Sequence, residues 1–182
     1  MSRIGRTPIT LTAGVSAKIE GKKVTITGPI GTLSQEVDNC IKVEIKDNVI
    51  HLTRNSEENE VKAKHGLYRA LINNMVNGVV KPYAKKLIIN GVGFKATKVG
   101  QKLVLNLGFS HPVELTPEQG INIECPSITE IVVSGINKEK VGQFAAQVRD
   151  LKKVEPYHGY GIRYSDEVVV KKEGKTSGKG KK

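Results

Sequence analysis

Aromatic, glycine and arginine residues gather in one short segment, residues 155–164. Three of the five tyrosines of the chain, Tyr157, Tyr160 and Tyr164, fall within eight positions there, with two glycines between them and Arg163 beside the last. Flat rings stack on unpaired bases, glycine lets a backbone approach a ligand closely, and a guanidinium donates paired hydrogen bonds to phosphate. The segment therefore favours RNA binding over the alternative, a glycine-rich turn whose tyrosines cover a sheet edge.

The chain ends in a strongly basic stretch, residues 171–182. It holds six lysines against the single carboxylate of Glu173, and it contains no apolar residue that a core could bury. Because burial cannot offset the entropy lost on ordering such a segment, we expect a flexible, disordered tail. A nucleic acid is the partner that this charge favours, and a solubilising role or a loose contact with an anionic membrane is the alternative.

The charge of the whole chain agrees with such a partner. Its 182 residues carry 29 Lys and Arg against 18 Asp and Glu, a net charge of +11, and the tail contributes +5 of that excess. No run of about 18 apolar residues is present, and the N-terminal charges are not followed by an apolar stretch. We therefore expect no membrane span and no secretory signal, and we expect a soluble protein of the cytoplasm.

Residues that could support catalysis or bind a metal are scattered. The two cysteines lie 85 positions apart with no second Cys or His at ligand spacing, so neither a disulfide framework nor a zinc site is indicated. Ser110 and His111 are adjacent without a third group to orient the base, and we expect Asp166 and Glu167 to cap or pair. The sequence therefore predicts no metal, no cofactor and no small-molecule substrate.

Two glycine motifs only partly match nucleotide-binding loops. Gly91-Val92-Gly93 follows an apolar run, but it lacks a third glycine and precedes a strand-like segment, so we expect a turn or bulge. Gly174-Lys175-Thr176 resembles the end of a phosphate-binding loop, but Val169 occupies the position of the required first glycine and no helix follows. Neither motif predicts a nucleotide site.

The elements that must hold the tyrosine segment occur twice along the chain. Residues 21–26 match residues 100–105 at a spacing of 79, each a glycine turn followed by alternating apolar and polar residues. Residues 64–71 match residues 140–147 at a spacing of 76, each with the apolar periodicity of a helix. Between them, each half has a second pair of strand-like runs, which predicts a small sheet followed by one helix.

Local signals predict where these elements begin and turn. Asp47-Asn48 and Pro126-Ser127 are expected to form the turns of the second strand pairs. Ser56 and Asn137 are acceptable helix N-caps, and Gly78 is expected to close the first helix.

The predicted fold is α+β: two tandem copies of a small domain, each an antiparallel or mixed β-sheet covered by one α-helix, followed by the disordered basic C-terminal tail. We place the first domain at residues 1–82, the second at residues 83–170 and the tail at residues 171–182. The tyrosine segment makes the second domain the main RNA-binding part.

Five ordered stretches of the chain match one known family. They are SRIGRTPI at the N-terminus, LIINGVGFKA at 87–96, LVLNLGFSHPV at 103–113, GINKEKVGQFAAQVR at 135–149 and EPYHGYGIRYSDE at 155–167. Over nearly its full length the chain resembles large-subunit ribosomal protein six of the bacterial type. The resemblance implies two tandem copies of one α+β fold and a structural, non-catalytic role in the large ribosomal subunit.

The resemblance also implies particular partners. It places the protein on 23S ribosomal RNA near the base of the factor-recruiting stalk, close to the loop that translational GTPases contact, and beside neighbouring large-subunit ribosomal proteins. It implies a role in subunit assembly and translation in the cytoplasmic ribosome.

The signature of that family indicates residues of the site. His158 and Tyr160 stand where the family pattern has lysine, and Val154 stands where it often has proline. Tyr160 could replace a lysine contact by stacking and His158 by hydrogen bonding. The candidate RNA-binding residues are Pro156, Tyr157, His158, Gly159, Tyr160, Gly161, Ile162, Arg163 and Tyr164 in the segment, and Lys152, Lys153, Lys171, Lys172, Lys175 and Lys179 around it.

Two other classes of function compete with this interpretation. A basic enzyme acting on RNA would need converging acid and base groups or a metal cluster, which the sequence does not offer. A protein-interaction adaptor would use its first domain and carry its charge incidentally, and its complexes would survive nuclease treatment.

Deletion of residues 171–182 should flatten the salt dependence of RNA binding. Each lysine that neutralises a phosphate adds roughly 0.7 to 0.9 to the slope of log affinity against log salt concentration. Filter binding over a salt series measures that slope for the full-length and shortened chains. Identical slopes would show that the tail makes no phosphate contact in the complex.

Overall fold

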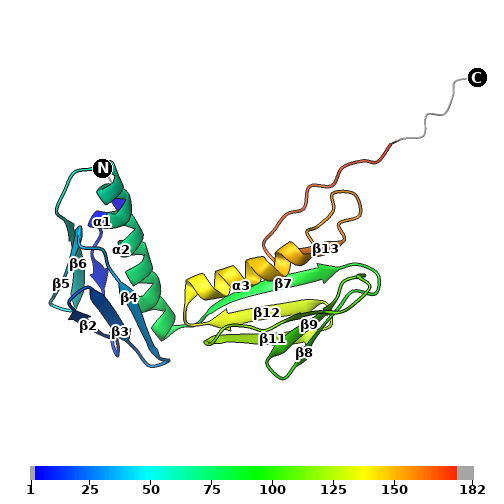
Figure 1. Ribbon diagram of the computed structural model, residues 1–182, viewed down its shortest axis with the longest axis horizontal. Coiled ribbons are helices and arrows are strands. Elements are labelled where there is room, and N and C mark those ends of the chain that lie inside the picture. The colour runs from blue at the N-terminus through cyan, green and yellow to red at the C-terminus, as the bar shows by residue number, and fades with distance from the viewer. Residues whose placement is uncertain (1–2, 176–182) are drawn as a thin grey trace, which may run out of the picture. The chain divides into compact units, whose positions relative to one another are not determined.

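The computed structural model describes residues 3–175 and comprises two compact units (Figure 1). The first unit runs to Tyr83 and includes residues 135–138, and the second contains residues 84–134 and the chain from Glu139 onward. Each unit contains one long helix and two small sheets, and the two are described in turn.

The first unit contains two three-stranded sheets, in the orders β2-β3-β4 and β1-β6-β5, whose paired strands are antiparallel. Helix α2 packs on both sheets, and the core between them is aliphatic, with Ile26, Ile50 and Ile72 fully buried. The elements are α1 (Arg3–Arg6), β1 (Ile9–Thr10), β2 (Ser16–Glu20), β3 (Lys23–Thr27), β4 (Thr32–Glu36), β5 (Ile41–Lys46), β6 (Val49–Arg54) and α2 (Asn59–Val80).

The second unit has sheets in the orders β10-β9-β8 and β11-β12-β7-β13. Figure 1 shows α3 lying along one face of the larger sheet, with β8 and β9 on the side away from the helix. Its core includes Leu87, Leu105, Ile131 and Val148. The elements are β7 (Tyr83–Asn90), β8 (Lys95–Val99), β9 (Lys102–Asn106), β10 (Val113–Leu115), β11 (Ile121–Ser127), β12 (Glu130–Gly135), α3 (Lys138–Leu151) and β13 (Gly161–Tyr164).

The two units repeat one topology, which confirms the predicted duplication and the α+β class. The order β1-β6-β5 corresponds to β7-β12-β11, and β2-β3-β4 corresponds to β8-β9-β10. The glycines aligned from the sequence occupy equivalent hairpin turns, with φ of 61° at Gly21 and 62° at Gly100. Each copy has two sheets where the sequence suggested one. Among residues 3–175, only the second copy has a further strand, β13.

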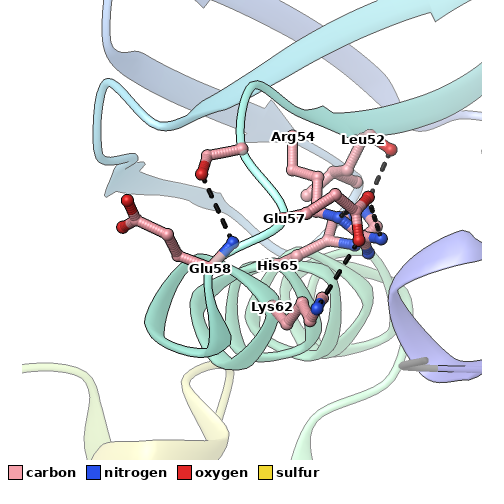
Figure 2. Close-up of polar contacts among 7 residues, drawn as sticks. Leu52, Arg54, Glu57, Glu58, Lys62 and His65 are labelled. Atoms are coloured by element: carbon pink, nitrogen blue, oxygen red, sulfur yellow. Dashed lines mark hydrogen bonds and ion pairs between the residues drawn. The ribbon is translucent and has the colours of Figure 1, made fainter.

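The start of α2 differs from the expectation for Ser56. The N-cap is Glu58, whose side chain makes no capping hydrogen bond, and the backbone N–H of Glu58 donates to Ser56 Oγ at 3.3 Å. Charged side chains close this junction, as Figure 2 shows: Arg54 Nη2 donates to Glu57 Oε1 at 2.6 Å, and Lys62 Nζ lies 3.6 Å from the other oxygen of Glu57. Ser56 therefore forms a local turn ahead of the helix and is not its cap.

A buried histidine joins α2 to the strand before it and to the N-terminal helix. His65 is 3% exposed, and its Nε2 lies 3.0 Å from the carbonyl oxygen of Leu52, toward which it points in Figure 2. Because a carbonyl only accepts, Nε2 carries the hydrogen of this contact. Gly5 packs so closely on the imidazole that a Cβ there would overlap the ring. A glycine in α1 is thus required by the packing of the N-terminal segment.

Two turn and cap positions expected from the sequence are wrong. Helix α2 continues past Gly78 and ends at Val80. Gly78 serves close packing instead, because a Cβ on it would overlap the carbonyl oxygen of Ile136. Strand β11 includes Pro126, and the turn to β12 is formed by residues 128–129. The turn at Asp47-Asn48 is confirmed, with φ of 49° and 60°.

Gly78→Ala should lower the stability of the chain, whereas Gly142→Ala should raise it. The first methyl group meets a backbone carbonyl and costs about 1 to 3 kcal/mol, as overpacking does. The second, inside α3, meets no atom within 4 Å, so only the helix preference of alanine acts, about 0.5 to 1 kcal/mol. Thermal denaturation of both variants measures the two changes. A stable Gly78→Ala protein would contradict the packing described for α2.

Candidate nucleic-acid interface

The tyrosine segment is held at its base by β13. This strand pairs antiparallel with β7, with Ile162 opposite Ile89 and Tyr164 opposite Leu87. On its other side, Lys153 forms a parallel bridge with Ile162, whose N–H donates to the carbonyl of Lys152 at 2.8 Å. The side chain of Ile162 is fully buried in the core. The chain between α3 and β13 is therefore a loop whose two ends, at residues 152–153 and at Ile162, are bonded to each other.

The two glycines of this loop serve its own backbone. Gly161 is buried at φ 139°, and a Cβ on it would lie 2.7 Å from the carbonyl oxygen of Lys153. Gly159 is also buried, with φ 79°, and its carbonyl accepts a hydrogen bond from Asn90 Nδ2 at 3.0 Å. Both glycines thus let the loop pack on residues 152–154 and on β7, a use additional to the close approach to a ligand that the sequence suggested.

Flat side chains face solvent from this loop. Tyr157 is 53% exposed and Tyr160 is 39% exposed. The rings of His158 and Tyr160 stack with their centroids 5.4 Å apart and an angle of 15° between their planes. Glu155 Oε1 lies 2.9 Å from His158 Nδ1 and accepts the backbone N–H of His158 at 3.1 Å. The two residues that depart from the family pattern therefore form one fixed stack.

Arg163 and Tyr164 take part in an ion-pair network at the end of β13. Arg149 on α3 donates two hydrogen bonds to the carboxylate of Glu167, at 2.5 and 2.9 Å. The same carboxylate accepts the backbone N–H of Tyr164 at 3.1 Å, and Arg163 Nη1 donates to the main-chain carbonyl of Glu167 at 3.1 Å. The expectation that Glu167 pairs is confirmed, although its side-chain partner is Arg149 on α3.

Cations also flank the ring of Tyr164. Lys85 Nζ lies 5.4 Å and Arg149 Cζ 5.6 Å from its centroid, and Lys85 Nζ is 3.7 Å from Asp166 Oδ2. Hydrogen bonding from Arg149 lowers the pKa of the Glu167 carboxyl below its ordinary value, and the N–H of Tyr164 adds to that effect. The end of β13 is thus fixed by charge as well as by strand pairing.

The lysines around the segment differ in what they contact. Lys152 Nζ lies 5.1 Å from the centroid of the Phe109 ring, and Lys153 is exposed with Asp150 3.5 Å away. Lys171, Lys172 and Lys175 are exposed.

Beyond β13, the described residues of the chain form no helix or strand. The backbone N–H of Lys172 donates to the carbonyl of Pro156 at 2.8 Å, which brings this stretch beside the loop. Val168 and Val170, which looked strand-like in the sequence, are 87% and 79% exposed and lie outside any strand. Lys179 lies outside the described residues, and the predicted disorder of the tail stays a prediction.

The remaining sequence motifs are structural. Gly91-Val92-Gly93 forms the turn between β7 and β8, as expected. Ser110 Oγ lies 3.4 Å from His111 Nδ1 on an exposed loop. Among residues 3–175, no group of three or more His, Cys, Asp or Glu is placed to hold a metal, and no helix there is both long and apolar enough to cross a membrane.

Three residues that position the segment were not identified from the sequence. Asn90 and Arg149 come from β7 and α3, and Phe109 comes from the loop between β9 and β10. No local pattern marks them, because each acts through a contact far away in the chain. All three lie inside matched stretches, at 87–96, 103–113 and 135–149, which was the available signal.

Comparison with known proteins identifies the family. The family model described as ribosomal protein L6 matches residues 11–81 and 90–165. The chain belongs to the ribosomal protein L6 family. The matched regions fall in the two copies of the fold. A relative named large ribosomal subunit protein uL6, from Carboxydothermus hydrogenoformans, is 52% identical over the whole of both chains. Another of that name, from Exiguobacterium sibiricum, is 51% identical over 97% of this chain and 99% of its own.

Membership of the L6 family settles the class of function. Its members are structural, non-enzymatic proteins of the large ribosomal subunit, so this chain is a ribosome-associated structural protein. The competing hypothesis of a basic enzyme acting on RNA is therefore wrong. RNA-binding and translation are the functional terms that fit the family.

Glu167→Gln should destabilise the chain, because the neutral amide cannot form the charged pair with Arg149. We expect the free energy of unfolding to fall by about 1 to 2 kcal/mol at neutral pH. Since folding lowers the pKa of Glu167, its contribution is present above the unfolded-state pKa, near 4.5, and is lost as the pH falls through the folded-state value. Denaturant unfolding at a series of pH values measures it.

The control for this prediction is Glu114→Gln, which removes the exposed pair with Lys102 in the same unit. Exposed pairs contribute little, so the control should unfold nearly as the unaltered chain does. A difference for Glu167→Gln that persists unchanged at acid pH would show that shape, and not charge, is what the carboxylate supplies.

Proposed function

We propose that the second unit binds 23S ribosomal RNA through the loop between α3 and β13 and through the lysines that follow. The observation that carries the proposal is the exposed group of Tyr157, His158 and Tyr160, held on a loop that is closed by strand pairing at its base. Aromatic faces presented on a rigid support suit unpaired bases, because stacking needs no sequence-specific hydrogen bonds.

The candidate residues divide into two roles. Tyr157, His158 and Tyr160 supply the surface that touches RNA. The exposed lysines Lys153, Lys171, Lys172 and Lys175, with Lys179 beyond the described residues, neutralise phosphates. Gly159, Gly161 and Ile162 are buried and act by positioning the loop. Pro156, through its carbonyl, brings Lys172 beside the loop.

Arg163 and Tyr164 both position the loop and can contact RNA. Each is half-buried, Arg163 through its hydrogen bond to the Glu167 carbonyl and Tyr164 between two cations. The guanidinium has five N–H donors, so the hydrogen bond to Glu167 does not exhaust its capacity to bind phosphate. We assign both residues to the edge of the RNA-binding surface.

Resemblance to the family supports a proposal for the place of the protein in the subunit. The proposed RNA lies near the base of the factor-recruiting stalk, close to the loop that translational GTPases contact, with other large-subunit proteins as neighbours. The protein would support subunit assembly and translation in the cytoplasm. Hydroxyl-radical footprinting on 23S RNA tests this placement, which predicts protection near the stalk base and is contradicted by protection elsewhere alone.

Replacing Tyr157 and Tyr160 together by alanine should weaken RNA binding strongly. Each lost stack costs about 1 to 3 kcal/mol, which corresponds to about 5- to 100-fold in affinity. The salt slope should stay unchanged, because no charge is removed. Equilibrium binding to a folded 23S RNA domain measures both quantities.

The matched control replaces the same two tyrosines by phenylalanine, which keeps the rings and removes only the hydroxyls. This variant should bind nearly as tightly as the unaltered chain. Equal affinity of the alanine variant and the unaltered chain would exclude the loop as the RNA-binding surface, and weak binding by both variants would assign the contact to the hydroxyls.

A further inference from the structure

Two further loops lie beside the tyrosine loop at the same end of the second unit. The β7–β8 turn is joined to it by the hydrogen bond from Asn90 to Gly159, and the β9–β10 loop by the contact of Lys152 with Phe109. Both loops pack on one ring, that of Phe94, because a Cβ at Gly91 or Gly108 would press against it. Their backbones are therefore fixed relative to the tyrosine loop.

Phe109 differs from the other phenylalanines of this unit. Its side chain is 42% exposed, whereas Phe144 is 5% exposed and Phe94 packs against the core. A large part of the Phe109 ring therefore stays accessible to a ligand. The ammonium group of Lys152 lies 5.1 Å from its centroid, within the range of a cation–π contact, which holds the ring in a defined position.

The charge around this ring favours a polyanion over a protein partner. Residues 84–113 contain five lysines, all in strands β7, β8 and β9, and no aspartate or glutamate, so no carboxylate stands in either loop. Lys152 adds a cation directly beside the ring. Such a basic surface attracts phosphates, whereas the centres of protein–protein interfaces are depleted of lysine. An aromatic ring with a cation beside it is a usual platform for a nucleotide base.

We propose that Phe109, with Lys152 beside its ring, stacks on an unpaired nucleotide and forms a second stacking position next to Tyr157 and Tyr160. The inference rests on the proposed function and adds to it a type of target: RNA with unpaired nucleotides, which contacts two loops of the unit. In this arrangement Lys152 holds the ring of Phe109 in position and can also bind a phosphate group.

Phe109→Leu tests the inference, because leucine keeps an apolar side chain and removes the flat ring. Binding to the folded 23S RNA domain should weaken about 5- to 100-fold, as expected for one lost stack, with an unchanged salt slope. Phe109→Tyr keeps the ring and should bind as the unaltered chain does. Thermal denaturation of both variants checks that the fold is intact.

The outcomes separate this inference from the proposed function. Full affinity of Phe109→Leu, together with weak binding of the alanine variant at Tyr157 and Tyr160, would overturn the second stacking position and leave the tyrosine loop in place. Full affinity of both variants would overturn the proposed function and the inference with it. If Phe109→Leu bound RNA with full affinity but was no longer incorporated into large subunits, the ring would contact a neighbouring protein and the inference would be wrong.

A second measurement covers the case in which Phe109→Leu fails to fold. Ultraviolet cross-linking of the unaltered chain to the RNA, followed by tryptic digestion, should give a cross-linked peptide of residues 103–138 that carries a nucleotide on Phe109. Cross-links at Tyr157 or Tyr160 without one at Phe109 would contradict the inference.

Discussion

The pairing of β13 with β7 is the interaction on which the whole candidate site depends. It places Ile162 in the core, where the backbone of Lys152 and Lys153 bonds to it and closes the loop that follows α3, and it directs the following residues past Arg149 and Lys85. Strand pairing supplies main-chain hydrogen bonds that are independent of side-chain identity. The exposed side chains of the loop, Tyr157, His158 and Tyr160, can therefore serve a ligand, whereas Gly159, Gly161 and Ile162 serve the fold.

The duplication shows what β13 adds. Both units share the arrangement of two small sheets and a helix, and only the second extends its larger sheet by this strand. The extra strand brings the tyrosine loop beside the β7–β8 and β9–β10 loops. In the second copy a short extension after the helix thus adds a loop to the shared fold. In the first copy, His65 near the start of α2 packs on Gly5 instead.

Much of this fold could be predicted from the sequence because the signals are local. Alternating apolar residues and turn glycines predicted the hairpins, and the recurrence of this pattern predicted the two copies of the fold. Signals that depend on distant contacts failed: Gly78 is a packing glycine because Ile136 approaches α2, and Ser56 is not a cap. For the same reason the clustered tyrosines could be found in the sequence, but Asn90 and Phe109 could not.

The central claim is that a shaped surface, and not charge alone, recognises the RNA. Equilibrium binding of the full chain to a folded 23S RNA domain, across a salt series and with excess transfer RNA as competitor, tests it most directly. The account predicts binding that survives the competitor with a modest salt slope. Binding that the competitor abolishes, with a steep slope, would show only polycation behaviour and would contradict the assignment of the tyrosine loop.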